Sequence, residues 1–229
     1  MVELGCGISG LLALSLGPSV GHFIATDQEY VRKLFRENIE ENAAAAIQLH
    51  HERQNPIRAR RKKNPSVAGN ARTGKRSGQA SDSSGNSLPN ISFTPLDWEL
   101  DVPSALKETI TDHGIDDKEE GDQDRGFDLL LSCDCIYNDA LIPPFVRTCA
   151  DICRLRLADD DHVSRNDRPR RPTVAVIAQQ QRSPEVFEAW LRETLAKFRV
   201  WRLSDEVLGD GLRAGTGYVV HVLLLRGES

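Results

Sequence analysis

A glycine-rich turn with an acidic residue just ahead of it lies within the first ten residues. Glu3 precedes Gly5, Gly7 and Gly10, and the stretch from Leu11 to Leu16 is apolar apart from one serine. A strand that runs through such a turn into a helix lets backbone N–H groups approach a nucleotide-like ligand. We expect Gly5 and Gly7 to leave room for that ligand, and Gly10 to let the helix pack close to the strand.

The charge of Glu3 discriminates between ligands. The glycine spacing matches the fingerprint of dinucleotide-binding proteins, but a carboxylate two residues before the first glycine is a poor neighbour for a pyrophosphate. A carboxylate at this place suits a ligand with a cationic amine or with ribose hydroxyls. A nicotinamide cofactor and a purely structural strand-to-helix turn are the alternatives that stay open.

Asp27 ends a short apolar segment, residues 22–26, that is typical of a second strand. It follows Gly10 at about the spacing at which a βαβ unit brings a carboxylate to a ribose. Residues 30–42 then carry apolar side chains at helical spacing. Asp27 could therefore bind a ribose or only cap this helix.

Asp97 and Trp98 follow a third expected strand, residues 91–96. In an open α/β sheet, ligands bind outside the carboxyl ends of the strands. Asp97 could accept a hydrogen bond from an adenine amine, and Trp98 could stack on the adenine ring. Ordinary core packing is the alternative for Trp98.

A carboxylate and an aromatic ring follow the most apolar segment of the chain. Residues 127–133 are typical of a strand that is buried on both faces of a parallel sheet, and they lead into Asp134, Cys135, Ile136 and Tyr137. Asp134 could hold an amine by its charge, and Tyr137 by its ring face or hydroxyl. Asp134 could instead cap the helix that follows.

Several of these stretches resemble motifs of a known family. Residues 2–10 resemble the first motif of the seven-strand S-adenosylmethionine-dependent methyltransferases. Residues 134–137 resemble the acidic-x-x-aromatic signature of the branch that methylates lysines on proteins, which includes the valosin-containing-protein and elongation-factor methyltransferases. Residues 134–138, 179–190 and 198–202 also resemble the members of this branch that act on ribosomal proteins.

The resemblance implies a cofactor, a substrate and a set of site residues. S-adenosylmethionine would be the cofactor, and a lysine of a large-subunit ribosomal protein the substrate. Asp134 and Tyr137 would be the catalytic residues. The residues expected to bind the cofactor are Glu3, Gly5, Cys6, Gly7, Asp27, Asp97, Trp98 and Cys133. Methyl transfer needs a neutral amine, whereas a free lysine has a pKa of about 10.4, so Asp134 would orient the ammonium or pass its proton to water.

Apolar segments of strand and helix type alternate along the chain. Further strands are expected at residues 173–178, 200–203 and 218–225, and further helices at 142–157 and 184–198, the last with Ser183 as its N-cap. This order predicts an α/β fold: an open, doubly wound, mostly parallel seven-strand, Rossmann-like sheet with one antiparallel strand.

Three polar segments interrupt this pattern, at residues 51–89, 107–126 and 158–172. They lack the apolar side chains that a core needs, so we expect disordered insertions in a single domain that spans residues 1–229. The first insertion is basic and includes Arg58 to Lys63. It could contact the ribosome or RNA weakly, or it could be a solvated loop or a nuclear address.

Composition excludes several classes of protein. A formal net charge of −5 does not suggest a dedicated nucleic-acid binder, and no apolar run reaches transmembrane length, so we expect no membrane contact. Five cysteines without a disulfide-type spacing indicate a reducing compartment, the cytosol or the nucleus. We disfavour a zinc site built from Cys133, Cys135, Cys149 and Cys153 because no histidine lies close in sequence. We expect no metal, and a monomer.

The resembled enzymes carry a segment, including helices, ahead of the first strand. Here the first strand begins at Met1, so we expect an N-terminally truncated methyltransferase domain. A truncated fold of this kind could also serve as a non-catalytic binding module, which is the alternative function.

Overall fold

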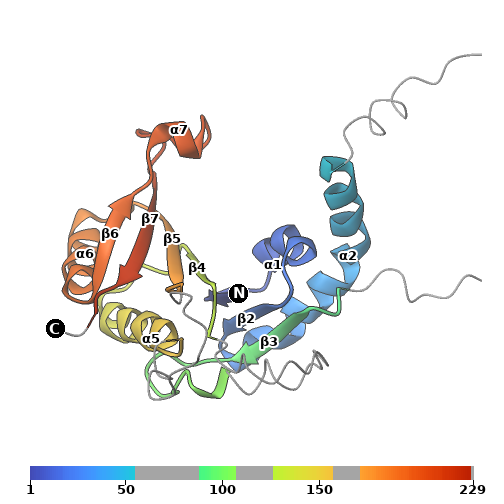
Figure 1. Cartoon of the computed structure of the whole chain (residues 1–229), viewed down its shortest axis with the longest axis horizontal. Helices are drawn as coiled ribbons and strands as arrows, with labels where there is room; N and C mark the ends of the chain where they lie inside the picture. Colours follow the sequence, from blue (N-terminus) through green and yellow to red (C-terminus); the bar gives the residue numbers. More distant parts are fainter. Residues whose placement is uncertain (55–87, 107–125, 157–170, 228–229) are drawn as a thin grey trace, which may run out of the picture.

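A computed structural model describes residues 1–54, 88–106, 126–156 and 171–227 (Figure 1). The strands are β1 (Val2–Leu4), β2 (Phe23–Asp27), β3 (Ile91–Pro95), β4 (Leu129–Cys133), β5 (Val174–Gln180), β6 (Phe198–Arg202) and β7 (Tyr218–Leu225). The helices are α1 (Leu11–Leu16), α2 (Arg32–Gln54), α5 (Ile142–Arg154), α6 (Pro184–Lys197) and α7 (Asp205–Leu208). The short 3-10 helices are η1 (Gly17–Ser19), η2 (Glu29–Val31) and η4 (Asp139–Leu141).

The described strands form one seven-stranded sheet in the order β3-β2-β1-β4-β5-β7-β6. Strand β7 runs antiparallel to both of its neighbours, and the other pairs are parallel. The predicted fold is confirmed. The chain builds outward from β1 to β3 in one direction and from β4 onward in the other, so the topological switch point lies between β1 and β4. A ligand is therefore expected at the carboxyl ends of these two strands.

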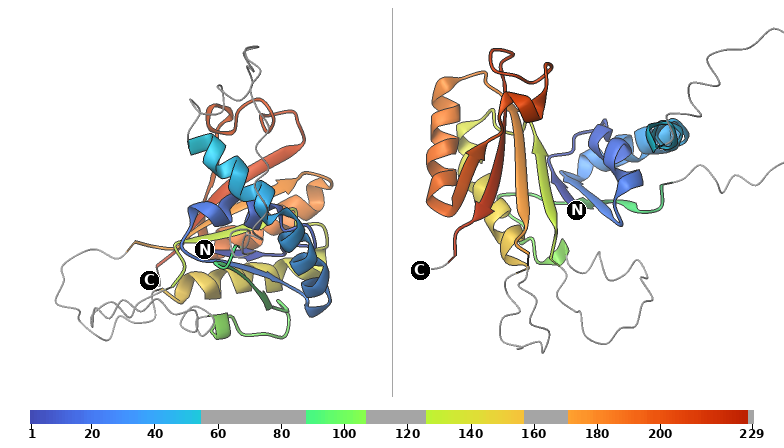
Figure 2. Two further views of the ribbon diagram at one scale, coloured as in Figure 1. Left: turned by 90° about the vertical axis from the view of Figure 1, so that its right-hand side faces the viewer. Right: turned by 45° about the horizontal axis from the view of Figure 1, so that its top comes forward.

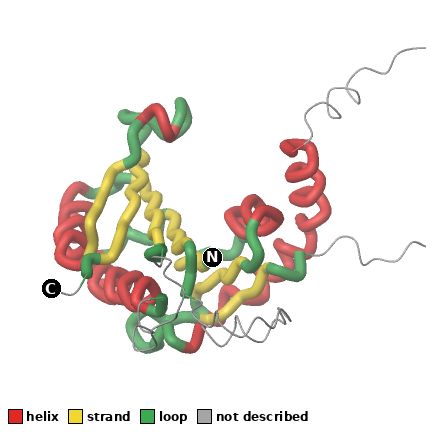
Figure 3. Tube along the Cα trace, in the orientation of Figure 1, coloured by secondary structure: helices red, strands yellow, loops and turns green. Residues whose placement is uncertain are grey.

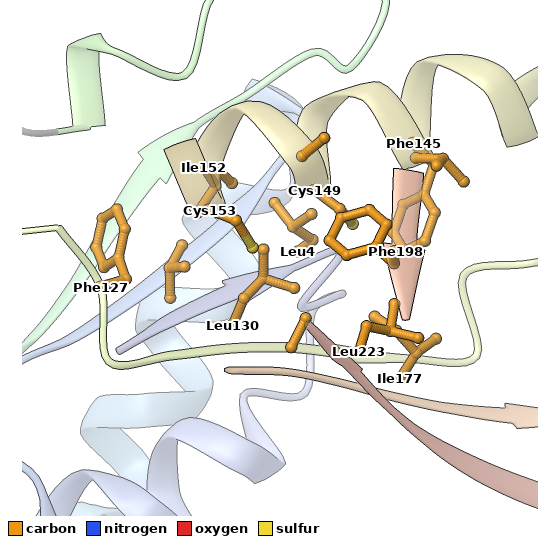
Figure 4. Packing of buried hydrophobic residues seen from close by; sticks show 14 of the residues in the cluster. Leu4, Phe127, Leu130, Phe145, Cys149, Ile152, Cys153, Ile177, Phe198 and Leu223 are labelled. Carbon is orange, nitrogen blue, oxygen red and sulfur yellow. The ribbon is translucent and has the colours of Figure 1, made fainter. Parts of the chain in front are cut away.

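Helices cover the two faces of the sheet. The helices α1 and α2 lie on one side and pack on β2 and β3, whereas α5 and α6 lie on the other side (Figure 2). Successive side chains of a strand point to opposite faces of the sheet, so the central strands contribute to an apolar core on each face. Val2 and Leu4 point toward α5, whereas Phe23 and Ala25 point toward α1 and α2. Figure 4 shows Leu4 and Leu130 of the sheet against Cys149 and Ile152 of α5.

The segment between β6 and β7 carries α7 and projects from the sheet (Figure 3). It leaves from the carboxyl end of β6, and the Gln181 N–H donates to the Gly217 carbonyl at 2.7 Å. The segment therefore approaches the sheet at the end where β5 terminates.

Some expected boundaries differ from the structure. Helix α2 continues to Gln54, so residues 51–54, assigned above to the first insertion, are helical. Alanine-rich and charged residues propagate a helix even without an apolar face, which explains the extension. Strand β6 begins at Phe198 rather than at residue 200. Helix α6 ends at Lys197, and the fully buried Phe198 already belongs to the strand. Most of the insertions, namely residues 55–87, 107–125 and 158–170, lies outside the described residues, so the expected disorder stays a prediction.

The start of α6 agrees with the sequence. Ser183 accepts a hydrogen bond from the Val186 N–H at 3.4 Å, and Pro184 occupies the first helical position. Within the described ranges, no helix has the length and apolarity needed to cross a membrane.

Candidate active site

The glycine turn after β1 folds back on the end of β2. The N–H groups of Gly5 and Cys6 both donate to the Thr26 carbonyl, at 2.9 and 3.1 Å. The Gly7 N–H donates to the Asp27 Oδ2 at 2.8 Å. The expectation that these N–H groups face a ligand is therefore wrong for residues 5–7, since acceptors of the protein itself take all three. A phosphate cradle of the dinucleotide type needs such groups free.

The three glycines are required for different reasons. All have positive φ, at 68° for Gly5, 61° for Gly7 and 60° for Gly10. A Cβ on Gly5 would lie 2.3 Å from the Cys135 Sγ, and a Cβ on Gly10 would lie 2.7 Å from the Ile39 Cδ1 of α2. Gly10 thus leaves room for side chains of α2. The expectation was that it lets the following helix pack close to the strand. At Gly7, no described atom lies within 4 Å of the Cβ position, so this is where the turn borders open space.

Gly7→Ala is expected to weaken the binding of S-adenosylmethionine, the cofactor implied by the resemblance, about tenfold to a hundredfold. The new methyl group would enter the open space that the ligand needs. The cost of left-handed backbone for a non-glycine residue, about 1–2 kcal/mol, falls on the fold and not on the affinity. Calorimetric titration measures the affinity. Gly215→Ala is the matched control, because Gly215 also has positive φ (90°) and open space in the structure as described. Equal affinity in both variants would contradict a ligand at Gly7.

Glu3 is a buried carboxyl group at the centre of the sheet. It pairs in register with Ala25 of β2 and Leu131 of β4, and its side chain is 3% exposed. Its Oε2 has no hydrogen-bond partner among the described residues. Burial, and secondarily the charge of Asp27, raises the pKa of Glu3 from 4.5 to about 7. An unpartnered buried carboxyl oxygen is costly, so its presence here points to a ligand that supplies the missing partner.

Asp27 does not cap the helix that follows. Its Oδ2 accepts from Gly7, its Oδ1 accepts from the Gln28 N–H at 2.7 Å, and the N-cap position of η2 is Gln28. The capping interpretation is therefore wrong. Each carboxylate oxygen keeps a free lone pair, so a pair of hydroxyls could still be bound.

Asp97 closes the turn after β3. Its Oδ1 accepts from the N–H groups of Glu99 and Leu100 at 2.8 and 3.3 Å, and its Oδ2 accepts from the Gln28 Nε2 at 3.0 Å. The hydrogen bond from Gln28, followed by that from Glu99, lowers the pKa of Asp97. Gln28 carried no signal in the sequence, yet it connects the ends of β2 and β3.

Trp98 lies beneath the glycine turn. Its ring makes an edge contact with Phe145 of α5, with centroids 5.1 Å apart, and its Cζ2 lies 3.3 Å from the Cβ position of Gly5. On the side that faces Phe145, the Trp98 ring therefore packs in the core, as the alternative interpretation expected. The Trp98 Nε1 is buried without a partner in the part of the chain that the structure describes.

The cysteines at this edge contact the turn differently. Cys6 packs its side chain into the core under α1, and Cys133 is exposed at the end of β4. Cys135 was not among the expected site residues, yet its Sγ lies 3.4 Å from the Leu4 carbonyl and 3.6 Å from that of Gly5. Partial desolvation at the edge of the sheet raises the pKa of Cys133, and burial raises that of Cys135 to about 12. These thiols are therefore protonated at neutral pH and are not thiolate nucleophiles.

The four cysteines weighed as a zinc site are divided between two places. Cys149 and Cys153 are buried in the apolar core beneath α5 (Figure 4), whereas Cys133 and Cys135 follow β4. The described ranges contain no group of three or more His, Cys, Asp or Glu side chains arranged to hold a metal ion.

Asp134 has left-handed backbone, with φ 59°, and is the one non-glycine residue of the described chain with positive φ. Its N–H donates to the Ala178 carbonyl at 2.8 Å. Its Oδ1 accepts from the Gln180 N–H at 3.3 Å, and its Oδ2 from the Arg182 Nη2 at 2.5 Å. Asp134 is therefore held by the end of β5. The capping interpretation is wrong, because Asn138 caps η4.

A small cleft borders Tyr137 on the side of β5. It is lined by Ile136, Tyr137, residues 179–183, Val186 and Phe187, and it holds about 60 Å³ of free space. The cleft is small, so it suits the end of a slender side chain and not a nucleoside. The Tyr137 side chain is 62% exposed, and the buried Gln179 Nε2 has no partner among the described residues.

The structure thus brings together most of the residues expected from the sequence. Glu3, Asp27 and Trp98 lie around the glycine turn, and the Cys135 sulfur packs against the same turn. Tyr137 lies on the far side, at the cleft. The arrangement offers carboxylates and an aromatic ring, which suit a cationic ligand beside an amine.

Comparison with curated proteins finds relatives over most of the chain. Ribosomal lysine N-methyltransferase 5 of Vanderwaltozyma polyspora is 29% identical over 211 residues, covering 91% of this chain and 55% of that protein. The enzyme of the same name from Eremothecium gossypii is 24% identical, covering 87% of this chain and 50% of that protein. The resemblance expected from the sequence is confirmed. The chain spans about half the length of these relatives.

Other comparisons add less. A 50-residue stretch, 22% of this chain, is 42% identical to 12% of a diaminohydroxyphosphoribosylamino-pyrimidine deaminase from Schizosaccharomyces pombe. No family model matches. Among solved structures, a methyltransferase from Pyrococcus furiosus has a TM-score of 0.45 at 12% identity, covering 99% of this chain and 74% of that one. A TehB-like S-adenosylmethionine-dependent methyltransferase from Corynebacterium glutamicum has 0.44 at 12% identity, with 98% and 79% coverage.

Proposed function

We propose that this chain is an S-adenosylmethionine-dependent methyltransferase that modifies a lysine of a protein, with a large-subunit ribosomal protein as the acceptor. The observation that carries the proposal is the buried Glu3 carboxyl group with an unpartnered oxygen at the glycine turn. The relatives described above support lysine as the acceptor. All five cysteines are free, which suits a cytosolic or nuclear protein.

The residues at the turn fit S-adenosylmethionine better than a dinucleotide. This cofactor carries a cationic sulfonium and a cationic amine, and Glu3 and Asp27 are acidic. A pyrophosphate would meet the same carboxylates without free N–H groups from residues 5–7. We assign Glu3 to the cationic part, Asp27 to the ribose hydroxyls and Asp97 to the adenine amine. Trp98 walls the adenine, and Gly7 leaves the room.

The amine is held at the ends of β4 and β5. When bound, the cofactor supplies an electrophilic methyl group next to a positive charge. The acceptor lysine must reach it as a neutral amine, aligned behind that methyl group. Asp134 orients the amine while water takes its proton, and the exposed Tyr137 ring packs along the lysine side chain. Alignment of two bound reactants can contribute about 7–11 kcal/mol to catalysis at best.

The test is methyl transfer from tritium-labelled S-adenosylmethionine by the purified chain to large-subunit ribosomal proteins. The proposal expects one labelled protein, with the label on a lysine by mass spectrometry. Cofactor binding without transfer to any lysine would contradict the acceptor class. Absence of cofactor binding would instead favour the non-catalytic binding module.

A further inference from the structure

Arg182 lies beside the proposed amine site. It follows β5 by two residues, and its guanidinium donates from Nη2 to Asp134 and from Nε to the Gln180 Oε1, at 3.1 Å. It also lines the cleft beside Tyr137. The guanidinium is therefore fixed at the carboxylate that is proposed to meet the substrate amine.

Stability does not account for this ion pair. The Arg182 and Asp134 side chains are 51% and 42% exposed. Ion pairs as exposed as this contribute little to folding, because water already solvates both charges well. The contribution of this ion pair to folding therefore does not explain why Arg182 is held at Asp134.

The chemistry of the amine supplies such a reason. A carboxylate close to a lysine side chain favours its protonated form, which has no lone pair to donate. Asp134 alone would hold the substrate well and at the same time keep it unreactive. A cation on the same carboxylate offsets that effect, since it disfavours a second positive charge nearby.

We propose that Arg182 is a positioning residue that holds Asp134 and keeps the bound lysine amine neutral. The inference rests on the proposed lysine methylation. Deprotonation places the ammonium proton on water, since the positive charge of Arg182 makes Asp134 a weaker base, and the freed lone pair is the nucleophile. Arg182 stays charged throughout, because a guanidinium does not give up its proton in proteins.

Other titratable groups near this place do not duplicate Arg182. Tyr137 supplies no cation, and Glu185, at the start of α6, accepts from the Ser183 hydroxyl at 2.7 Å. Glu3 and Cys133 lie at the ends of β1 and β4, and neither supplies a cation. Arg182 is thus the basic side chain that these contacts place on Asp134.

The test compares Arg182→Gln and Arg182→Lys in the methylation of the acceptor protein identified by labelling. The pH profile of kcat reports the protonation of the bound amine. Loss of the charge in Arg182→Gln is expected to move the rising limb about one pH unit upward. The expected kcat is about tenfold lower near neutral pH and close to wild type at high pH, with KM not increased. Arg182→Lys is expected to restore most of the wild-type profile.

The outcomes separate the possibilities. Arg192→Gln, at an exposed arginine of α6, controls for loss of a positive charge elsewhere, and thermal unfolding checks the fold. An equal loss of kcat at every pH would make Arg182 merely structural and overturn the inference. Higher activity in Arg182→Gln would make Arg182 a blocker of the amine site and also overturn it. A wild-type chain that transfers no methyl group would overturn the proposed function itself.

Discussion

Replacement of Asp134 by asparagine is expected to lower the kcat of lysine methylation about a thousandfold while cofactor affinity stays within a few-fold. Asp134 contacts the end of β5 through Gln180 and Arg182, and within the described residues no hydrogen bond joins its side chain to the glycine turn. Its loss should therefore appear in the alignment of the amine, where errors cost factors of a hundred or more. Asparagine tolerates the left-handed backbone at this position, so the fold should survive.

The measurement pairs single-turnover methyl transfer with calorimetric titration of the cofactor. Asp128→Asn is the matched control, because Asp128 precedes the same strand at its opposite end and also pairs with an arginine, Arg156. It should leave turnover unchanged. Turnover like wild type in Asp134→Asn would remove Asp134 from the site. A parallel loss of cofactor affinity would make it a cofactor-binding residue.

Glu3→Gln is expected to stabilise the cofactor-free chain at alkaline pH and to weaken cofactor binding. The pKa of Glu3 is about 7 in the fold against 4.5 as its ordinary value. The folded chain therefore binds the extra proton between these pH values, and stability falls as the pH rises through this window. One pKa unit corresponds to about 1.4 kcal/mol, so the full loss is about 3 kcal/mol. Glutamine removes the charge and with it this loss.

Urea unfolding at pH 5.5 and pH 8.5 measures the effect. Relative to wild type, Glu3→Gln should gain about 2 kcal/mol between these pH values. Glu188→Gln, at an exposed position of α6, is the control and should gain nothing. Loss of a charged hydrogen bond costs about 1.5–3 kcal/mol, so cofactor affinity should fall about tenfold to a hundredfold. Unchanged affinity would remove Glu3 from the cofactor site.

The elements that the sequence predicted best are those with unambiguous local signals. Strand β7 (Tyr218–Leu225) matches the expected range, because its short length, its β-branched and aromatic residues and the glycine before it favour a strand over a helix. The Ser183-Pro184 pair marks the start of α6 for a local reason as well. The carboxyl-end positions of Glu3 and Asp134 follow from the order of strands and helices.

The reasons for individual residues depended on tertiary contacts and could not be predicted. Gly5 is required by the Cys135 sulfur, more than 100 positions away in sequence, and Gly10 by a side chain of α2. The sequence left helix capping open for Asp27, because it does not show that the glycine turn folds back on β2. In the structure Asp27 instead accepts a hydrogen bond from the Gly7 N–H. No role was expected for Arg182, because its partner Asp134 follows a different strand and lies 48 positions away in sequence.

Calorimetric titration of the purified chain with S-adenosylmethionine at pH 7 tests the central claim most directly. The account predicts one-to-one binding that releases a fraction of a proton, since a cationic ligand beside Glu3 favours its ionised form. It also predicts that Gly7→Ala weakens this binding and that NAD does not bind. No binding of S-adenosylmethionine, or tighter binding of NAD, would contradict it.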